Sequence, residues 1–137
     1  MSMLLETTKH DGRRRRGMSK ILVIEDDRVI GAILDRVLGH AGHTVQVVQR
    51  LSEGRAILES RDVDLILLDL NLPDGSGLEF LRALRQEMRR ETPVMVLSGM
   101  RQEDHIVRGL RLGADDYVTK PFSPLELVAR VDRLTRV

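Results

Sequence analysis

Several short apolar segments of the sequence end in polar residues whose types could carry out chemistry together. These residues are Glu25 and Asp26 after ILVI, Asp69 after DLILL, Ser98 after VMVL, and Lys120 after DYVT. Three carboxylates cannot all stay ionised at close range without a cation, because like charges raise one another's pKa. A few carboxylates completed by water molecules suit Mg²⁺ better than Ca²⁺. The pattern therefore predicts a magnesium site.

Two of these residues suit the binding of a phosphoryl group. Lys120 offers a positive charge and Ser98 a hydroxyl, and both can hold phosphoryl oxygens. Only three of the 22 basic residues are lysines, and one of them stands here. A compact ammonium fits a small inorganic group better than a forked guanidinium does. With Mg²⁺ beside it, Asp69 could accept a phosphoryl group and become an acyl phosphate.

The periodicity of the sequence indicates how these residues are brought together. Five apolar segments typical of strands alternate with five amphipathic segments typical of helices. The expected strands cover 21–24, 43–48, 64–69, 93–98 and 116–120, and the expected helices cover about 28–40, 52–60, 76–89, 103–112 and 124–135. Strands joined by helical crossovers run parallel, with helices on both faces of the sheet. Their carboxyl ends meet at one edge, where open α/β sheets bind ligands.

Local signals support three of the helices. Ser76 with Glu79 has the spacing of a capping box, and Ser123 with Pro124 marks the start of the last helix. The apolar residues at helical spacing in the first helix, which we expect to pack into the core, are Val29, Ile33, Val37 and Leu38.

The composition is typical of one globular domain. The chain has 137 residues, of which 42% are hydrophobic and 31% charged, with a formal net charge of +1. The absence of cysteine excludes disulfides, thiol catalysis and cysteine-ligated metal sites. No apolar run is long enough to span a bilayer and no signal-peptide core is present, so we expect a cytoplasmic protein without membrane partners. The histidines share no metal-ligand spacing, and we expect solvated or capping roles for His10, His40, His43 and His105.

Residues 1–17 lack apolar periodicity and contain the basic run Arg13–Arg16, so we expect a basic extension outside the fold. Blocks of like charge repel one another and usually stay solvated. A solvated tail is therefore favoured, and a basic arm that touches nucleic acid or an anionic surface stays open as the alternative. The domain proper is expected over residues 18–137.

These residues, in this order, resemble the receiver domain of two-component response regulators over about residues 19–137. The resemblance rests on four linked motifs, ILVIEDD, DLILLDLNLPDGSGLEF, PVMVLSG and GADDYVTKPF. It implies a CheY-like fold, a doubly wound α/β fold with five parallel strands in the order 2-1-3-4-5. It also implies that Asp69 is the phosphoacceptor, and that Asp26, Asp69 and the backbone carbonyl of Asn71 bind Mg²⁺, with Glu25 assisting.

The resemblance also assigns roles to residues around the phosphoacceptor. Ser98 and Tyr117 would form a switch pair, in which the hydroxyl moves toward the phosphoryl group and the ring turns inward. Lys120 would contact the phosphoryl group, and the Lys120–Pro121 peptide would be cis. The donor would be a sensor histidine kinase. The chain itself would carry out only autophosphorylation and autodephosphorylation, so it is not expected to be an enzyme.

The last motif is most similar to the winged-helix transcription-factor (OmpR/PhoB-like) branch. That similarity implies a homodimer, formed on phosphorylation through the fourth helix, fifth strand and fifth helix. The charged residues expected on this face are Arg111, Asp116, Glu126, Arg130 and Asp132. Arg111 and Asp132 have the opposite signs from those usual in the branch, so their bridge would be kept with its charges exchanged. DNA would be bound only through an output domain outside this chain; whether the chain stands alone or belongs to a longer regulator stays open.

Two other classes of function share part of this pattern. Phosphatases of the haloacid-dehalogenase type also use an aspartate at a strand end, but they need a second aspartate two residues later, where this chain has Asn71. A pure interaction module would have lost Asp69, an acidic residue or Lys120, and all are present. Both classes are therefore less favoured than a phosphorylation switch.

Overall fold

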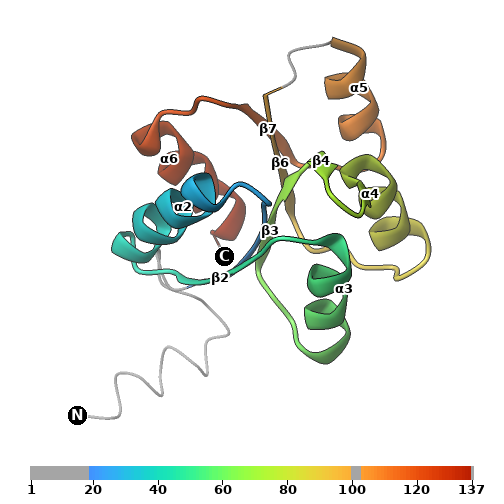
Figure 1. Ribbon diagram of the computed structural model, residues 1–137, viewed down its shortest axis with the longest axis horizontal. Helices are drawn as coiled ribbons and strands as arrows, with labels where there is room; N and C mark the ends of the chain where they lie inside the picture. Colours follow the sequence, from blue (N-terminus) through green and yellow to red (C-terminus); the bar gives the residue numbers. More distant parts are fainter. Residues whose placement is uncertain (1–18, 100–102, 137) are drawn as a thin grey trace.

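The computed structural model describes residues 19–99 and 103–136, in which strands alternate with helices (Figure 1). The five strands of the main sheet are β1 (Lys20–Ile24), β2 (Thr44–Val48), β3 (Leu65–Asp69), β6 (Val94–Ser98) and β7 (Asp116–Thr119). The helices are α2 (Arg28–His40), α3 (Leu51–Ser60), α4 (Gly77–Gln86), α5 (Glu103–Arg111) and α6 (Pro124–Thr135). All neighbouring strands are parallel, in the order β2-β1-β3-β6-β7. The predicted doubly wound fold and its strand order are confirmed.

The residues at both ends of the chain lie outside the described part of the structure. The predicted extension over 1–17, with the run Arg13–Arg16, lies outside the described residues, and so do Met18 and Val137 at the limits of the expected domain. Within the part of the chain that is described, no helix is long and apolar enough to cross a membrane.

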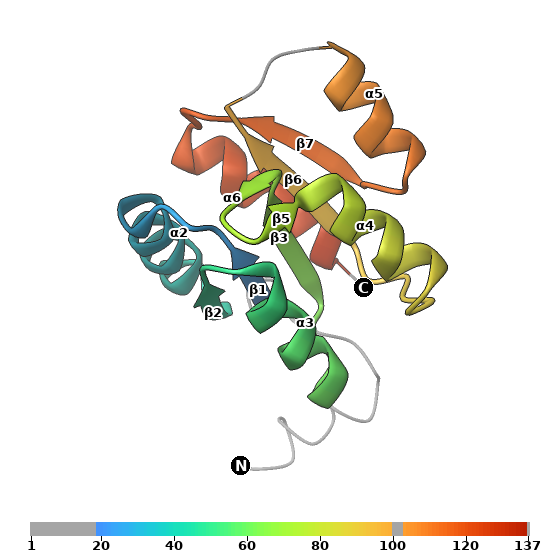
Figure 2. The same ribbon diagram turned by 45° about the vertical axis from the view of Figure 1, so that its right-hand side comes forward.

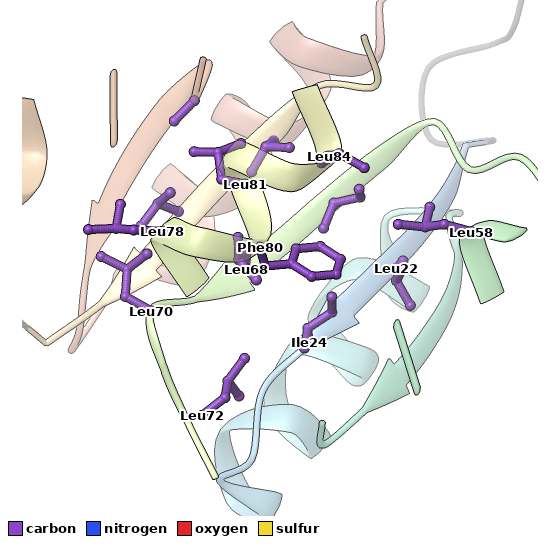
Figure 3. Close-up of a cluster of buried hydrophobic side chains, with 14 residues drawn as sticks. Leu22, Ile24, Leu58, Leu68, Leu70, Leu72, Leu78, Phe80, Leu81 and Leu84 are labelled. Atoms are coloured by element: carbon purple, nitrogen blue, oxygen red, sulfur yellow. The ribbon is translucent and has the colours of Figure 1, made fainter. Parts of the chain in front are cut away.

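The helices form two layers, with α2 and α6 on one face of the sheet and α3, α4 and α5 on the other (Figure 1). Because side chains alternate along a strand, β1 contributes to two separate apolar clusters. Ile21 and Val23 pack under α2 and α6, whereas Leu22 and Ile24 pack under α3 and α4. Figure 3 shows the second cluster, where Phe80 of α4 lies near Leu22 and Ile24. Burial on both faces explains why the central strands are continuous apolar runs.

The buried face of α2 differs from the expected one. Val29 is 69% exposed and Ile33 is 42% exposed, so the prediction that both pack into the core is wrong. Of the other two residues expected in the core, Leu38 is fully buried and Val37 is half-buried. Leu34, which was not expected there, is also fully buried, and Gly31 lies close against β2. The helix has apolar residues on two faces, and the one that carries the small Gly31 packs on the sheet.

The chain between β3 and α4 forms a small hairpin that the periodicity did not indicate. Two short antiparallel strands, β4 (Asn71–Leu72) and β5 (Gly75–Ser76), pair before α4 begins. Ser76 caps α4 as predicted, since its Oγ accepts a hydrogen bond from the Glu79 N–H at 3.4 Å.

The far end of α4 lies earlier than expected. The helix ends at Gln86 rather than at residue 89, because Arg89 takes a φ of 53°, in the left-handed region. Met88 still packs against the cluster below α4. The apolar face of α4 therefore continues past the end of the helix.

Candidate functional site

The predicted site residues come together at the carboxyl edge of the sheet. Glu25 and Asp26 follow β1, Asp69 ends β3, and Lys120 follows β7. One carboxylate oxygen from each of the three acidic residues lies within 4.8 Å of the others. Glu25 and Asp69 are buried, whereas Asp26 is exposed. The cluster is thus held by the interior of the sheet and open to solvent on one side.

Lys120 joins the two buried carboxylates. Its Nζ lies 2.6 Å from Oε1 of Glu25 and 3.3 Å from Oδ2 of Asp69. Burial alone would lower the pKa of Lys120, but the hydrogen bond to Glu25 and the charges of Asp69 and Glu25 outweigh it, and the pKa is raised above its usual value. The lysine therefore keeps its positive charge at neutral pH.

The carboxyl group of Glu25 has a raised pKa. Burial raises its pKa from 4.5 to about 7, and the nearby Asp69 acts in the same direction. The hydrogen bonds from Lys120 and from the Asp27 N–H, which is 3.1 Å from Oε2, oppose this rise. Glu25 therefore holds its proton more tightly than an exposed glutamate does.

The donor set fits a magnesium ion. All three side chains offer carboxylate oxygens, which hard divalent cations prefer, and the exposed side leaves room for the water ligands that Mg²⁺ retains. Asn71, the fourth predicted ligand, donates its N–H to Oδ1 of Asp69 at 3.2 Å. That its carbonyl binds the metal stays a prediction.

Gly77 is a site residue that the sequence reasoning missed. A Cβ at this position would lie 2.4 Å from the carbonyl oxygen of Asp69 and 2.7 Å from Cα of Leu70. The Gly77 N–H also donates to the carbonyl of Leu70 at 2.8 Å. The start of α4 thus packs directly on the backbone of Asp69. The sequence signal for this contact is the glycine itself. The first position of a helix allows most residues, so a glycine there indicates close approach of another backbone.

The expected switch pair lies on neighbouring strands. Ser98 is fully buried at the end of β6, and its carbonyl accepts the Lys120 N–H at 2.9 Å. Tyr117 pairs with Val96 in the sheet and packs, half-buried, against the cluster under α3 and α4. The Lys120–Pro121 peptide is cis. The roles of Ser98 and Tyr117 as a switch stay predictions.

Three of the charged residues expected on the dimer face form one network. Asp116 accepts two hydrogen bonds from Nη1 of Arg130, at 2.9 and 3.1 Å, and one from Arg133 at 2.9 Å. Glu126 lies 3.4 Å from Nε of the same arginine. The hydrogen bond to Asp116 raises the pKa of Arg130. Arg133 was not expected from the sequence.

The other two charged residues point elsewhere. Asp132 lies roughly 200° around α6 from Arg130, and its Oδ1 is 3.4 Å from Nε2 of His43. Arg111 lines a groove between α4 and α5 together with Arg82 and Arg108. The predicted salt bridge between Arg111 of one copy and Asp132 of another would therefore require Asp132 to give up its contact with His43.

His43 is not solvated, and that expectation is wrong. The residue is 5% exposed, and its Nδ1 accepts the backbone N–H of Ser19 at 3.3 Å while Nε2 faces Asp132. Asp132 of α6 thus lies beside the ring, which directly precedes β2. His40 is exposed and His105 is half-buried, while His10 lies outside the described residues.

Comparison with known proteins gives concordant results. A family model described as the response regulator receiver domain matches residues 21–132. The cell cycle response regulator CtrA of Brucella ovis is 44% identical over 117 residues, which cover 85% of this chain and 50% of CtrA. The chain therefore spans about half the length of the curated relatives it matches.

Solved structures agree with this fold. The receiver domain of the Francisella response regulator 1452 is 31% identical, with a TM-score of 0.80 over 85% of this chain and 96% of that chain. The BeF3-activated N-terminal receiver domain of Klebsiella pneumoniae RstA is 30% identical, with a TM-score of 0.80 over 86% of this chain and 99% of that chain.

Proposed function

Because the chain belongs to the response regulator receiver domain family, whose members are phosphorylation-activated switches, we propose that Asp69 is its phosphoacceptor. One observation carries the proposal: the Asp69 carboxylate ends the central strand β3, with the Lys120 ammonium at 3.3 Å and the carboxylates of Glu25 and Asp26 beside it. The family makes the chain a signalling regulator rather than a classical enzyme.

The proposed reaction moves a phosphoryl group from a phosphohistidine of a sensor histidine kinase to Asp69. A carboxylate oxygen of Asp69 attacks phosphorus, the P–N bond breaks, and its electron pair returns to the imidazole ring of the donor. Lys120 holds one phosphoryl oxygen with its ammonium group, which is already positioned by Glu25. Mg²⁺, when bound by Glu25, Asp26, Asp69 and the Asn71 carbonyl, supplies positive charge for the phosphoryl oxygens. Water later hydrolyses the acyl phosphate.

The exposed apolar residues next to the site suit the docking of the kinase. Val29 and Ile33 lie on α2, which begins just after the acidic pair, and Leu125, which is 84% exposed, lies on α6 just after the Lys120 loop. Both helices are on the same face of the sheet (Figure 1). A partner that brings a phosphohistidine to Asp69 would cover these side chains, which explains why they stay apolar although the core does not use them.

The output of the switch is proposed from the branch that the sequence resembles. Phosphorylation would reorganise Ser98 and Tyr117 and promote a cytoplasmic homodimer through the α5–β7–α6 face, where Asp116, Glu126 and Arg130 lie. Because the matched segment is only 50% of CtrA, control of transcription through a DNA-binding output domain is part of this proposal.

The first experiment is phosphorylation by a small donor. The protein is incubated with acetyl phosphate, with and without Mg²⁺, and its intact mass is measured, with Asp69→Asn as the control. We expect a gain of one phosphoryl group that needs Mg²⁺ and is absent in the variant. No gain under any condition would leave a phosphorylation-independent interaction module with this fold. Phosphate on Asp69→Asn would remove Asp69 from its proposed role.

A further inference from the structure

The start of α3 lacks a cap of its own. Arg50 occupies the N-cap position and its side chain makes no capping hydrogen bond. The first N–H groups of a helix have no partner within it, so they need acceptors from elsewhere. Here the N–H of Leu51 donates to Oδ1 of Asp74 at 2.9 Å, and the N–H of Ser52 donates to Oδ2 at 3.1 Å. Asp74 therefore caps α3 from a distant part of the chain.

Asp74 belongs to the turn of the β4–β5 hairpin, which lies between α4 and the start of α3 (Figure 2). The same turn has an apolar contact with α3. Gly75 has a φ of 152°, which favours glycine, and a Cβ built on it would lie 3.2 Å from Cδ1 of Leu51. Leu51 in turn packs against the core cluster under α4. The turn is thus fixed on α3 by two hydrogen bonds and by close packing.

The other end of the hairpin is fixed to the site. Asn71, the first residue of β4, pairs with Ser76 and donates its N–H to Asp69. Gly77 follows directly and packs on the backbone of Asp69. The backbone that carries the Asn71 carbonyl is therefore held between Asp69 on one side and the Asp74–α3 contact on the other.

We propose that Asp74 is a positioning residue for the metal site, which holds the hairpin so that the Asn71 carbonyl faces Glu25, Asp26 and Asp69. This inference rests on the proposed function, because it concerns the same Mg²⁺ site. Asp74 does not touch the acidic cluster. It acts through the segment 71–74, which joins it to Asn71. Metal affinity depends strongly on groups that orient the ligands without binding the ion themselves.

A role as a helix cap alone would stabilise α3 without affecting the metal. The test therefore compares Asp74→Ala and Asp74→Asn with Ser123→Ala, which removes the cap of a different helix. Ser123 Oγ accepts the Glu126 N–H at 3.4 Å at the start of α6. Mg²⁺ is titrated into each protein and followed by NMR and calorimetry, and the amide exchange rates of residues 51 and 52 are measured without metal.

We expect Asp74→Ala to weaken Mg²⁺ binding by about tenfold and to speed amide exchange at Leu51 and Ser52. Asp74→Asn keeps one oxygen acceptor, so its loss of affinity should be smaller. Ser123→Ala should bind Mg²⁺ like the unchanged protein. If Asp74→Ala does not fold, Asp74→Asn still removes half of the contact, and the same comparison with Ser123→Ala decides.

Two results would overturn the role of Asp74. The first is Mg²⁺ affinity within about twofold of the unchanged protein in both Asp74 variants, although exchange at Leu51 and Ser52 rises. The second is an equal loss of Mg²⁺ affinity in Ser123→Ala, which would mean that the affinity depends on the general stability of the fold. Failure of the unchanged protein to bind Mg²⁺ is a different outcome, because it contradicts the proposed function itself.

Discussion

The ammonium of Lys120 lies closer to Glu25, at 2.6 Å, than to the proposed phosphoacceptor Asp69, at 3.3 Å. The side chains of Glu25 and Asp69 are only 1% and 8% exposed, so water screens their mutual repulsion poorly. We therefore propose two functions for Lys120 at the site. It compensates the buried carboxylates before phosphorylation, and it is in place to hold a phosphoryl oxygen.

Lys120→Met should separate these functions, because methionine keeps an unbranched stem without the charge. We expect the rate of phosphorylation by acetyl phosphate to fall about tenfold or more, since a donor to the phosphoryl oxygen is lost. Mg²⁺ affinity should not fall, because a competing positive charge has been removed from the carboxylates. Lys20→Met, at an exposed position in β1, is the control. An unchanged phosphorylation rate would contradict the proposed role of Lys120.

Glu25 should make the metal-free protein sensitive to pH near neutrality. Its pKa rises from 4.5 to about 7 on folding, chiefly because the group is buried. Between about pH 4.5 and about pH 7, the folded state therefore holds a proton on Glu25 that the unfolded chain has released. This contribution to the free energy of unfolding is fully present below about pH 4.5 and is lost as the pH rises through about 7. Melting temperatures measured in EDTA should show this fall, and Glu25→Gln should remove it.

Mg²⁺ binding should have the opposite dependence on pH. As a proposed Mg²⁺ ligand, Glu25 would bind in its ionised form, so the affinity for Mg²⁺ should rise as the pH increases through about 7, with release of a proton at lower pH. Calorimetric titrations in buffers of different ionisation enthalpy measure that proton. A pH-independent Mg²⁺ affinity between pH 6 and pH 8, chosen to bracket the Glu25 pKa of about 7, would remove Glu25 from the ligand set.

Gly77 should tolerate no side chain. A Cβ there would lie 2.4 Å from the carbonyl oxygen of Asp69, so Gly77→Ala must push α4 away from the end of β3. We expect a loss of about 2 kcal/mol in the free energy of unfolding, as for other overpacked positions. Gly39→Ala is the matched control, since nothing lies within 4 Å of its added Cβ. Alanine also favours the helix at that position, so urea unfolding should show no loss there.

The sequence was sufficient to predict those parts of the molecule that depend on local pattern. Glu25, Asp69 and Lys120 were predicted together because each ends or follows an apolar strand, and parallel strands end at one edge. The hydrogen bonds between Asp74 and α3 could not be predicted in this way, because the cap and the helix are 22 and 23 residues apart and helix signals are read from neighbours.

The buried face of α2 shows a second limit of prediction. Its sequence offers two apolar faces, one with Val29 and Ile33 and one with Leu34 and Leu38. Periodicity alone does not choose between them. The choice depends on packing against β2, where Gly31 allows close approach. The face that stays exposed, with Val29 and Ile33, is the one that we propose as a docking surface for the kinase.

The burial of His43 could not be predicted either, because it depends on contacts with Ser19 and Asp132, which are distant in sequence. This burial supports a final prediction. Nδ1 accepts the N–H of Ser19, so the neutral ring carries its hydrogen on Nε2, which lies 3.4 Å from Oδ1 of Asp132. His43→Ala would leave the buried Ser19 N–H without its acceptor and open a cavity, which should cost about 2 kcal/mol or more. His40→Ala, an exposed neighbour, should change stability by less than about 0.5 kcal/mol. Equal effects of the two substitutions in urea unfolding would show that the buried ring of His43 and its hydrogen bond from Ser19 do not stabilise the fold.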